Sequence, residues 1–232
     1  MGNIAIIPAR GGSKRIPKKN IRNFMGKPII EYAIENAINS KLFDEVMVST
    51  EDDEIAELSI NLGARVPFKR SEKNSDDYAS TIDVISEVIR SYEKLGLFFN
   101  YACCIYPCTP LLTRDKLIES YNKLKKEDLD CVFPILKFGF PIQRAVRINS
   151  NGLVEMFNPE HLTTRSQDLE KSYHDAGQFY FFKVNKLISK QKLLTDSTGY
   201  IELSEFEAQD IDSLVDWELA EMKYKKKNNI FN

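Results

Sequence analysis

The sequence predicts an α/β fold built on a mainly parallel, doubly wound sheet. Short, continuous apolar runs, typical of strands buried on both faces, alternate with segments whose apolar residues repeat every 3.6 residues, as in amphipathic helices. The chain has 232 residues, which is enough for a single domain with a proper core, so we expect one domain over residues 1–232. In such folds, ligands bind at the carboxyl ends of the strands.

In the first half of the chain, strands and helices alternate regularly. The first apolar run ends in a glycine-rich turn, as expected of a buried strand that delivers a loop to the edge of the sheet. Gly63 suits the left-handed residue after a helix, and Ser80 suits a helix N-cap. The predicted elements are a strand at 3–8, a helix at 28–40, a strand at 45–50, a helix at 52–62, a strand at 66–69 and a helix at 81–92.

The second half begins with the same alternation and then changes. Residues 137–171 are rich in Pro, Asn, Arg and isolated aromatic residues and show no helical period, so they are interpreted as an excursion from the main sheet. A regular run of apolar residues follows at 178–184. The other predicted elements are a strand at 101–106, a loop at 107–110, a helix at 113–125, a strand at 130–136 and a C-terminal helix at 213–227 whose terminal lysines favour the helix dipole.

Composition excludes several classes of partner. The net charge is −2, so neither nucleic acid nor an anionic membrane is an expected partner. No stretch approaches the roughly 20 consecutive apolar residues of a membrane span, and the N-terminus does not resemble a signal peptide. The four cysteines lack the paired spacing of zinc or redox sites, so we expect reduced thiols and a cytoplasmic location.

Residues 7–21 form the most informative stretch of the sequence. Two glycines let backbone N–H groups approach an anion closely, and five cations within ten residues offset the charge of a triphosphate. The stretch matches neither the Walker A pattern nor the GxGxxG dinucleotide pattern, which disfavours an ordinary ATPase or dehydrogenase. A phosphate-binding loop is the functional interpretation. A solvated basic turn is the structural alternative for glycines and lysines taken alone.

Near the C-terminus, two aspartates precede the last predicted helix. Asp210 and Asp212 are spaced to project from the same side of an extended segment, and carboxylate oxygens are the ligands that Mg²⁺ prefers. An N-terminal helix cap is the alternative role, and Asp212 is suited to it.

Taken whole, residues 7–21 resemble the signature of the CMP-sugar synthetases, the acylneuraminate cytidylyltransferase family of sugar nucleotidyltransferases. The resemblance covers almost the full chain and continues at 26–30, 43–46, 48–52, 55–56, 63–64, 77–83, 107–112 and 210–212. It implies a Rossmann-like fold of the nucleotide-diphospho-sugar transferase type. It also implies transfer of CMP from CTP to the anomeric hydroxyl of a nonulosonic acid, with release of pyrophosphate and with Mg²⁺, or Mn²⁺, as the cofactor.

The resemblance also assigns roles to residues. Arg70 and Ser80 would recognise cytosine and its surroundings. Ser71, however, follows Arg70 where the family commonly has proline, and the alternative role for Arg70 is to cap the end of its strand. The acidic pair becomes the metal site rather than a cap. The implied nucleotide-binding residues are Arg10, Gly11, Gly12, Ser13, Lys14, Lys19, Asn20, Arg70 and Ser80; the implied catalytic residues are Arg10, Lys14, Asp210 and Asp212, of which Asp210 and Asp212 hold the metal.

On the acceptor side the chain departs from the sialic acid synthetases. Residues 106–112 read Tyr-Pro-Cys-Thr-Pro-Leu-Leu, where those enzymes often have Gln-Pro-Thr-Ser-Pro-Leu-Arg. This loop and the Asp-Ala-Gly-Gln-Phe-Tyr string at 175–180 are similar to those of family members that activate pseudaminic acid for bacterial flagellin or surface glycans. The residues expected to meet the acceptor are Tyr106, Arg165, Gln167 and Gln178, with a surface role in a loop as the alternative for Arg165.

The resemblance further implies that the 137–171 excursion is a dimerisation element of a homodimer, one protomer's loop reaching into its partner's site. His161 and His174 lack partners that would indicate acid–base or metal chemistry. The rival functions are a CMP-legionaminate or CMP-N-acetylneuraminate synthetase, a CMP-Kdo synthetase, whose characteristic Gln-Gly-Asp string is absent, and a catalytically inactive nucleotide-binding regulator.

Overall fold

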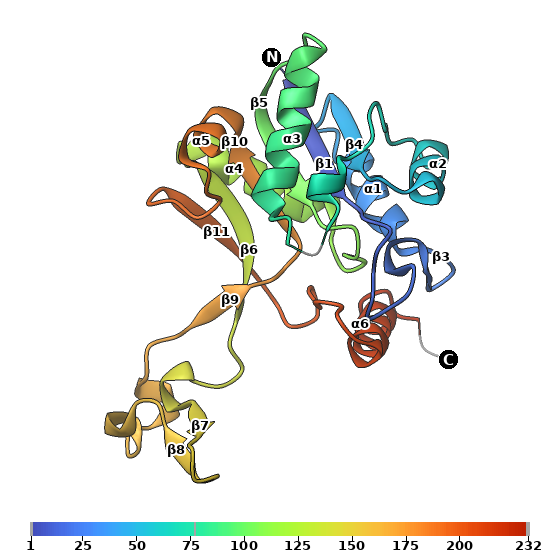
Figure 1. Ribbon diagram of the computed structural model, residues 1–232. Helices are drawn as coiled ribbons and strands as arrows, with labels where there is room; N and C mark the ends of the chain where they lie inside the picture. Colours follow the sequence, from blue (N-terminus) through green and yellow to red (C-terminus); the bar gives the residue numbers. More distant parts are fainter. Residues whose placement is uncertain (1, 77, 231–232) are drawn as a thin grey trace.

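A seven-stranded sheet forms the centre of the protein in the computed structural model, which describes residues 2–76 and 78–230 (Figure 1). Asp77, the first residue of the 77–83 stretch named above, lies outside the described residues. The strand order is β11-β6-β10-β5-β1-β4, with β9 paired to β6. The strands are β1 (Gly2–Pro8), β2 (Asn23–Phe24), β3 (Lys27–Pro28), β4 (Glu45–Ser49), β5 (Phe99–Ile105), β6 (Cys131–Lys137), β7 (Val146–Ile148), β8 (Val154–Met156), β9 (Tyr173–Asp175), β10 (Phe179–Lys183) and β11 (Thr198–Leu203).

The sheet is mixed, with parallel pairs on both sides of one reversed strand. β1 pairs in parallel with β4 and β5, and β6 pairs in parallel with β11. β10 runs antiparallel to both β5 and β6, and this brings its amino end to the carboxyl end of β5. The helices are α1 (Ile29–Ser40), α2 (Asp53–Asn61), α3 (Thr81–Lys94), α4 (Arg114–Lys126), α5 (Val184–Lys190) and α6 (Leu214–Lys227).

Apolar side chains cover both faces of the sheet, as the continuous apolar strands predicted. Alternate residues of β1 point to opposite faces: Ala5 and Ile7 pack in a cluster with residues of α1 and α4, whereas Ile4 and Ile6 pack with residues of α3 and α5. These four side chains are fully buried. The predicted α/β class with helices on both faces is therefore confirmed.

A third apolar cluster joins the two ends of the chain. Phe24, in the short β2–β3 hairpin that follows the basic loop, packs edge-on against Trp217 of α6 at 5.4 Å between ring centroids. Ile16 and Ile211 are buried in the same cluster. Because Ile211 separates the two predicted metal ligands, this packing fixes the acidic segment beside the basic loop.

The excursion predicted at 137–171 forms an arm that extends away from the sheet between β6 and β9 (Figure 1). Its only pairing beyond β9 among the described residues is the small β7–β8 hairpin. Large apolar side chains are exposed along the arm: Phe138, Phe140, Ile142, Val146, Ile148, Leu153, Val154, Phe157 and Leu162.

One predicted strand is wrong. Residues 66–69 form no strand, because the chain pairs with β4 only at Arg65, through hydrogen bonds to Val46 and Val48, and then turns away until the Arg70 N–H meets the carbonyl of Thr50. Within the described part of the chain, no helix has the length and apolar character needed to cross a bilayer.

Candidate active site

One cavity of about 450 Å³ lies at the carboxyl ends of β1 and β5, where the fold class places ligands. It combines residues from the beginning, middle and end of the chain. Its basic side comes from the loop after β1, and its acidic side from the segment before α6. The lining residues are Pro8, Arg10, Ser13, Lys14, Arg15, Lys19, Asn20, Tyr106, Pro107, Cys108, Gly177, Asp210 and Ile211.

Buried Asn20 shapes the basic loop. Its side-chain N–H donates to the main-chain carbonyl of Arg10 at 2.8 Å, which draws the two ends of the loop together. Its oxygen accepts a hydrogen bond from the Cys108 thiol at 3.2 Å. Asn20 therefore ties the loop after β1 to the loop after β5, and Arg10, Lys14 and Lys19 line one cavity as a result.

Gly11 is required by a close approach. A Cβ built on Gly11 would lie 2.5 Å from Oδ2 of Asp52, whereas one built on Gly12 would meet nothing within 4 Å. The Gly11 N–H donates to Oε1 of Glu51 at 2.8 Å. Asp52 is itself the N-cap of α2 and accepts from the N–H of Ile55 at 3.0 Å. The glycine thus lets the loop lie directly against the start of α2.

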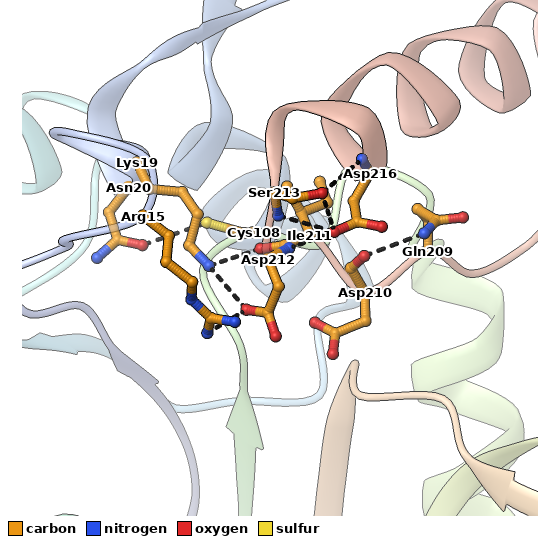
Figure 2. Close-up of polar contacts among 10 residues, drawn as sticks. All are labelled: Arg15, Lys19, Asn20, Cys108, Gln209, Asp210, Ile211, Asp212, Ser213 and Asp216. Atoms are coloured by element: carbon orange, nitrogen blue, oxygen red, sulfur yellow. Dashed lines mark hydrogen bonds and ion pairs between the residues drawn. The ribbon is translucent and has the colours of Figure 1, made fainter. Parts of the chain in front are cut away.

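The acidic segment is held by α6 and by the basic loop together. Ser213 is the N-cap of α6 and forms a capping box with Asp216. Asp212 is therefore not the helix cap, which was the alternative role considered for it. Figure 2 shows Lys19 and Arg15 reaching toward this segment. Lys19 Nζ donates to the Ile211 carbonyl at 2.6 Å and lies 3.7 Å from Asp212, and Arg15 pairs with Asp212 at 2.7 Å.

The two aspartates repel one another. Burial raises the pKa of Asp210 above its usual value, and the neighbouring Asp212 raises it further, while Lys19 opposes the shift. A divalent cation would relieve this repulsion, and carboxylate oxygens are hard ligands suited to Mg²⁺. Among the described residues no group of three or more potential ligands occurs, so phosphate oxygens or water would complete the coordination. The donor set therefore fits Mg²⁺ bound together with a nucleotide.

The two residues predicted near cytosine lie outside the cavity lining. Arg70 is buried, and its guanidinium donates to the carbonyl of Ser49 and to Ser49 Oγ, the latter at 3.1 Å. Burial lowers its pKa, although Glu51 and Glu87 oppose this shift. Ser80 is the N-cap of α3, as the sequence predicted, and it forms a capping box with Asp83.

The four predicted acceptor residues fall in two places. Tyr106 lines the cavity, and its hydroxyl lies 3.0 Å from Oγ1 of Thr81. Gln178 is buried beside it, with its amide N–H donating to the carbonyl of Glu207. Arg165 and Gln167 lie on the arm and are exposed; Arg165 pairs with Asp168 at 2.7 Å. Within one protomer the structure does not bring these two residues to the cavity.

Three polar residues in or beside the cavity were not predicted as site residues. Arg15 and Cys108 line the cavity, although Arg15 was counted only among the cations of the loop and Cys108 only as a reduced thiol. All four cysteines are indeed free. The third, Asp175, accepts a hydrogen bond from the hydroxyl of Tyr180 beside Tyr106. The 175–180 string carried the only signal for this pair, and spacing alone did not reveal the contact.

A basic, glycine-rich loop at the carboxyl ends of strands, opposite two carboxylates, is an arrangement suited to a nucleotidyltransferase. The sequence matches the cytidylyltransferase family over residues 4–228. The chain belongs to this family, and it is a CTP-dependent nucleotidyltransferase.

Individual relatives show the same kinship. The chain is 43% identical to the pseudaminic acid cytidylyltransferase of Campylobacter jejuni over 225 residues, covering 97% of each protein. It is 29% identical to the CMP-N,N'-diacetyllegionaminic acid synthase of Legionella pneumophila, covering 94% of each. Among solved structures, CMP:2-keto-3-deoxy-manno-octonic acid synthetase complexed with CTP superposes with a TM-score of 0.72 at 16% identity, over 98% of this chain and 100% of that one. This likeness supports the fold.

Proposed function

We propose that the protein transfers the cytidylyl group of CTP to the anomeric hydroxyl of pseudaminic acid and releases pyrophosphate. The observation that carries the reaction is the single cavity that gathers Arg10, Lys14 and Lys19 opposite Asp210. The observation that favours this sugar is the 43% identity with a pseudaminic acid cytidylyltransferase over nearly the full length of both chains.

The chain's own residues supply positioning and charge. In the proposed reaction the anomeric oxygen attacks the α-phosphorus in line, and the bond from that phosphorus to the pyrophosphate oxygen breaks. Arg10 and Lys14 bind the phosphate oxygens and stabilise the negative charge that gathers on the leaving pyrophosphate. Ser13, which lines the cavity beside them, orients the triphosphate. No protein nucleophile is needed, because alignment and electrostatic stabilisation account for the acceleration.

Mg²⁺, or Mn²⁺ in its place, is proposed to bind at Asp210 and Asp212. The raised pKa of Asp210, which lines the cavity, and the position of Asp212 beside Arg15 and Lys19 of the basic loop support this assignment. When bound, such a cation supplies Lewis-acid stabilisation of phosphate oxygens. Lys19 and Arg15 hold the segment that carries both aspartates, so they position the ligands without binding the metal themselves.

The arm is proposed to form a homodimer. Its exposed apolar side chains leave an area that a second copy of the chain would cover, and symmetric pairing is the commonest oligomeric arrangement. In such a dimer Arg165 and Gln167, which lie outside their own cavity, would reach the acceptor side of the partner's cavity. We further propose a cytoplasmic location, in line with four free cysteines, and a role in building flagellin or surface glycans.

Pyrophosphate release tests this function directly. Purified protein is supplied with CTP and Mg²⁺ and, separately, with pseudaminic, legionaminic, N-acetylneuraminic and Kdo acids, with ATP and UTP as nucleotide controls. Release that requires pseudaminic acid and CTP is the expected result. Release with a different acid would replace the sugar and keep the reaction. No release with any of the four, in folded protein, would favour an inactive nucleotide-binding regulator.

A further inference from the structure

A short loop beside the cavity touches one of its principal cations. Residues 71–76 follow the buried Arg70 and contain a 3-10 helix at Glu72–Asn74. None of them lines the cavity, yet the main-chain carbonyl of Asp76 accepts a hydrogen bond from Nη1 of Arg10 at 3.0 Å. The position of this loop therefore influences where the Arg10 guanidinium lies.

A single carboxylate on α3 holds the loop in place. Oε1 of Glu87 accepts from the N–H of Ser71 at 2.8 Å, and Oε2 accepts from Ser71 Oγ at 3.0 Å and from the side-chain amide of Asn74. Hydrogen bonds to an ionised acceptor are stronger than neutral ones. The neighbouring Val88 is buried in the core, so Glu87 projects from a rigid helix. Glu87 thus connects the loop to the body of the protein.

Glu87 also acts on the arginine at the start of the loop. Burial lowers the pKa of Arg70, whereas the negative charges of Glu51 and Glu87 favour its charged form. The nearby Arg10 disfavours it. The carboxylate of Glu87 therefore lies within electrostatic reach of the buried Arg70 guanidinium. It also binds the loop whose Asp76 carbonyl holds the Arg10 guanidinium.

We propose that Glu87 is a positioning residue for CTP: it fixes residues 71–76, so that the Asp76 carbonyl holds Arg10 in the orientation that binds the phosphates. This inference rests on the proposed function of the cavity. Glu87 itself lies outside the cavity lining and touches no part of the proposed substrate site. Its loss should weaken CTP binding and leave the acceptor's KM nearly unchanged, because the loop lies on the nucleotide side.

The backbone of Ser71 provides a matched test. Its φ of −66° and ψ of 150° are values that proline adopts, so proline could fix this residue without the carboxylate. Proline has no N–H, however, and its ring would occupy the space from which the Ser71 N–H reaches Glu87 at 2.8 Å. Ser71→Pro should therefore weaken CTP binding when Glu87 is present and strengthen it when Glu87 is replaced by alanine.

The experiment measures CTP affinity by calorimetry with Mg²⁺, together with KM, kcat and the thermal midpoint, in the full-length protein. Glu87→Ala should weaken CTP binding roughly 5- to 20-fold, and Glu87→Gln should weaken it less, because an amide keeps only one accepting oxygen. Ser71→Pro should weaken binding alone but restore it at least severalfold in Glu87→Ala. Glu93→Ala, an exposed position later on the same helix, should match wild type.

Two results would overturn the proposal. CTP affinity within twofold of wild type in folded Glu87→Ala would show that Glu87 and the loop it holds do not position the nucleotide site. A weakened Glu87→Ala that Ser71→Pro fails to restore would show that the carboxylate acts by another route. Wild-type protein that binds no CTP would overturn the proposed function as well. A failure of the proposed function is therefore distinguishable from a failure of the proposed role of Glu87.

Discussion

Two lysines in the basic loop have the same charge and different surroundings. Lys14 lines the cavity, whereas Lys18 lies outside it and pairs with Glu54 on α2. Lys14→Ala should therefore raise the KM for CTP about 10- to 100-fold, with a smaller effect on the KM for the sugar, since a cation aimed at the phosphates is lost. Lys18→Ala, the matched control, should leave both values nearly unchanged. Equal behaviour of the two variants in steady-state kinetics would remove Lys14 from the phosphate site.

Two aspartates near the start of α6 should respond differently to substitution. Asp212→Asn weakens a proposed metal ligand without changing volume, so Mg²⁺-dependent turnover should fall on the order of 100-fold. Its ion pair with Arg15 is exposed, so the free energy of unfolding should change little. Asp216→Ala removes the partner of the Ser213 cap and should lower that free energy by about 1 kcal/mol. Turnover titrations with Mg²⁺, combined with thermal melts, distinguish the two effects, and wild-type turnover in folded Asp212→Asn would exclude it as a ligand.

The thiol in the cavity should be unreactive. Burial, with the charges of Asp210 and Asp212 adding to it and Lys19 opposing it, raises the pKa of Cys108 from 9.0 to about 12. The reactive thiolate appears only as the pH rises toward that value, so at pH 8 its share falls from about one tenth to about one part in ten thousand.

Iodoacetamide should therefore modify Cys108 far more slowly than free cysteine between pH 7 and pH 9. Peptide mass spectrometry of native protein follows the rate, and unfolded protein, in which all four cysteines react, is the control. Rapid modification at pH 8 in the native state would contradict the raised pKa.

The contact between the glycine-rich loop and α2 makes two adjacent glycines unequal. Gly11→Ala would place a methyl group 2.5 Å from Oδ2 of Asp52 and displace the N-cap of α2. We expect a loss of about 1 kcal/mol in the free energy of unfolding and weaker CTP binding, because the loop must shift. Gly12→Ala, which meets nothing within 4 Å, should keep wild-type stability. Denaturant unfolding of the pair tests the contact; a stable Gly11→Ala would mean that the loop moves freely.

The elements that were predicted correctly have clear apolar patterns, either a continuous apolar run in a strand or a 3.6-residue apolar repeat in a helix. β1, α1, α3 and α6 begin and end within a few residues of the predicted bounds, and Ser80 caps α3 as expected. β11 was missed because it alternates, with Ile201 and Leu203 buried and Tyr200 and Glu202 exposed, whereas continuous apolar runs were the pattern sought. α5, with seven residues, is too short to show a helical period.

The site divides in a similar way between local and long-range information. Residues that line the cavity from one contiguous loop, such as Arg10 and Lys14, could be predicted to lie together because glycines and cations are adjacent in the sequence. The contacts that shape the loop could not be predicted, since Asn20 with Cys108 and Phe24 with Trp217 are side-chain pairs distant in the sequence. Only the folded chain brings such pairs together. The same holds for Glu87, which no motif marks.

The arm carries an apolar surface that is exposed to water in a single protomer. Ile148 and Val154 form a register pair on its β7–β8 hairpin and are 76% and 69% exposed. If a second copy covers this hairpin, Ile148→Lys with Val154→Lys should convert the dimer to a monomer, because two buried charges would lack partners. Sedimentation velocity measures the change. Leu194→Lys, at an equally exposed apolar site outside the arm, should remain dimeric. Turnover should fall with the dimer if Arg165 and Gln167 serve the partner's cavity, and an active monomer would restrict the acceptor site to residues of one chain.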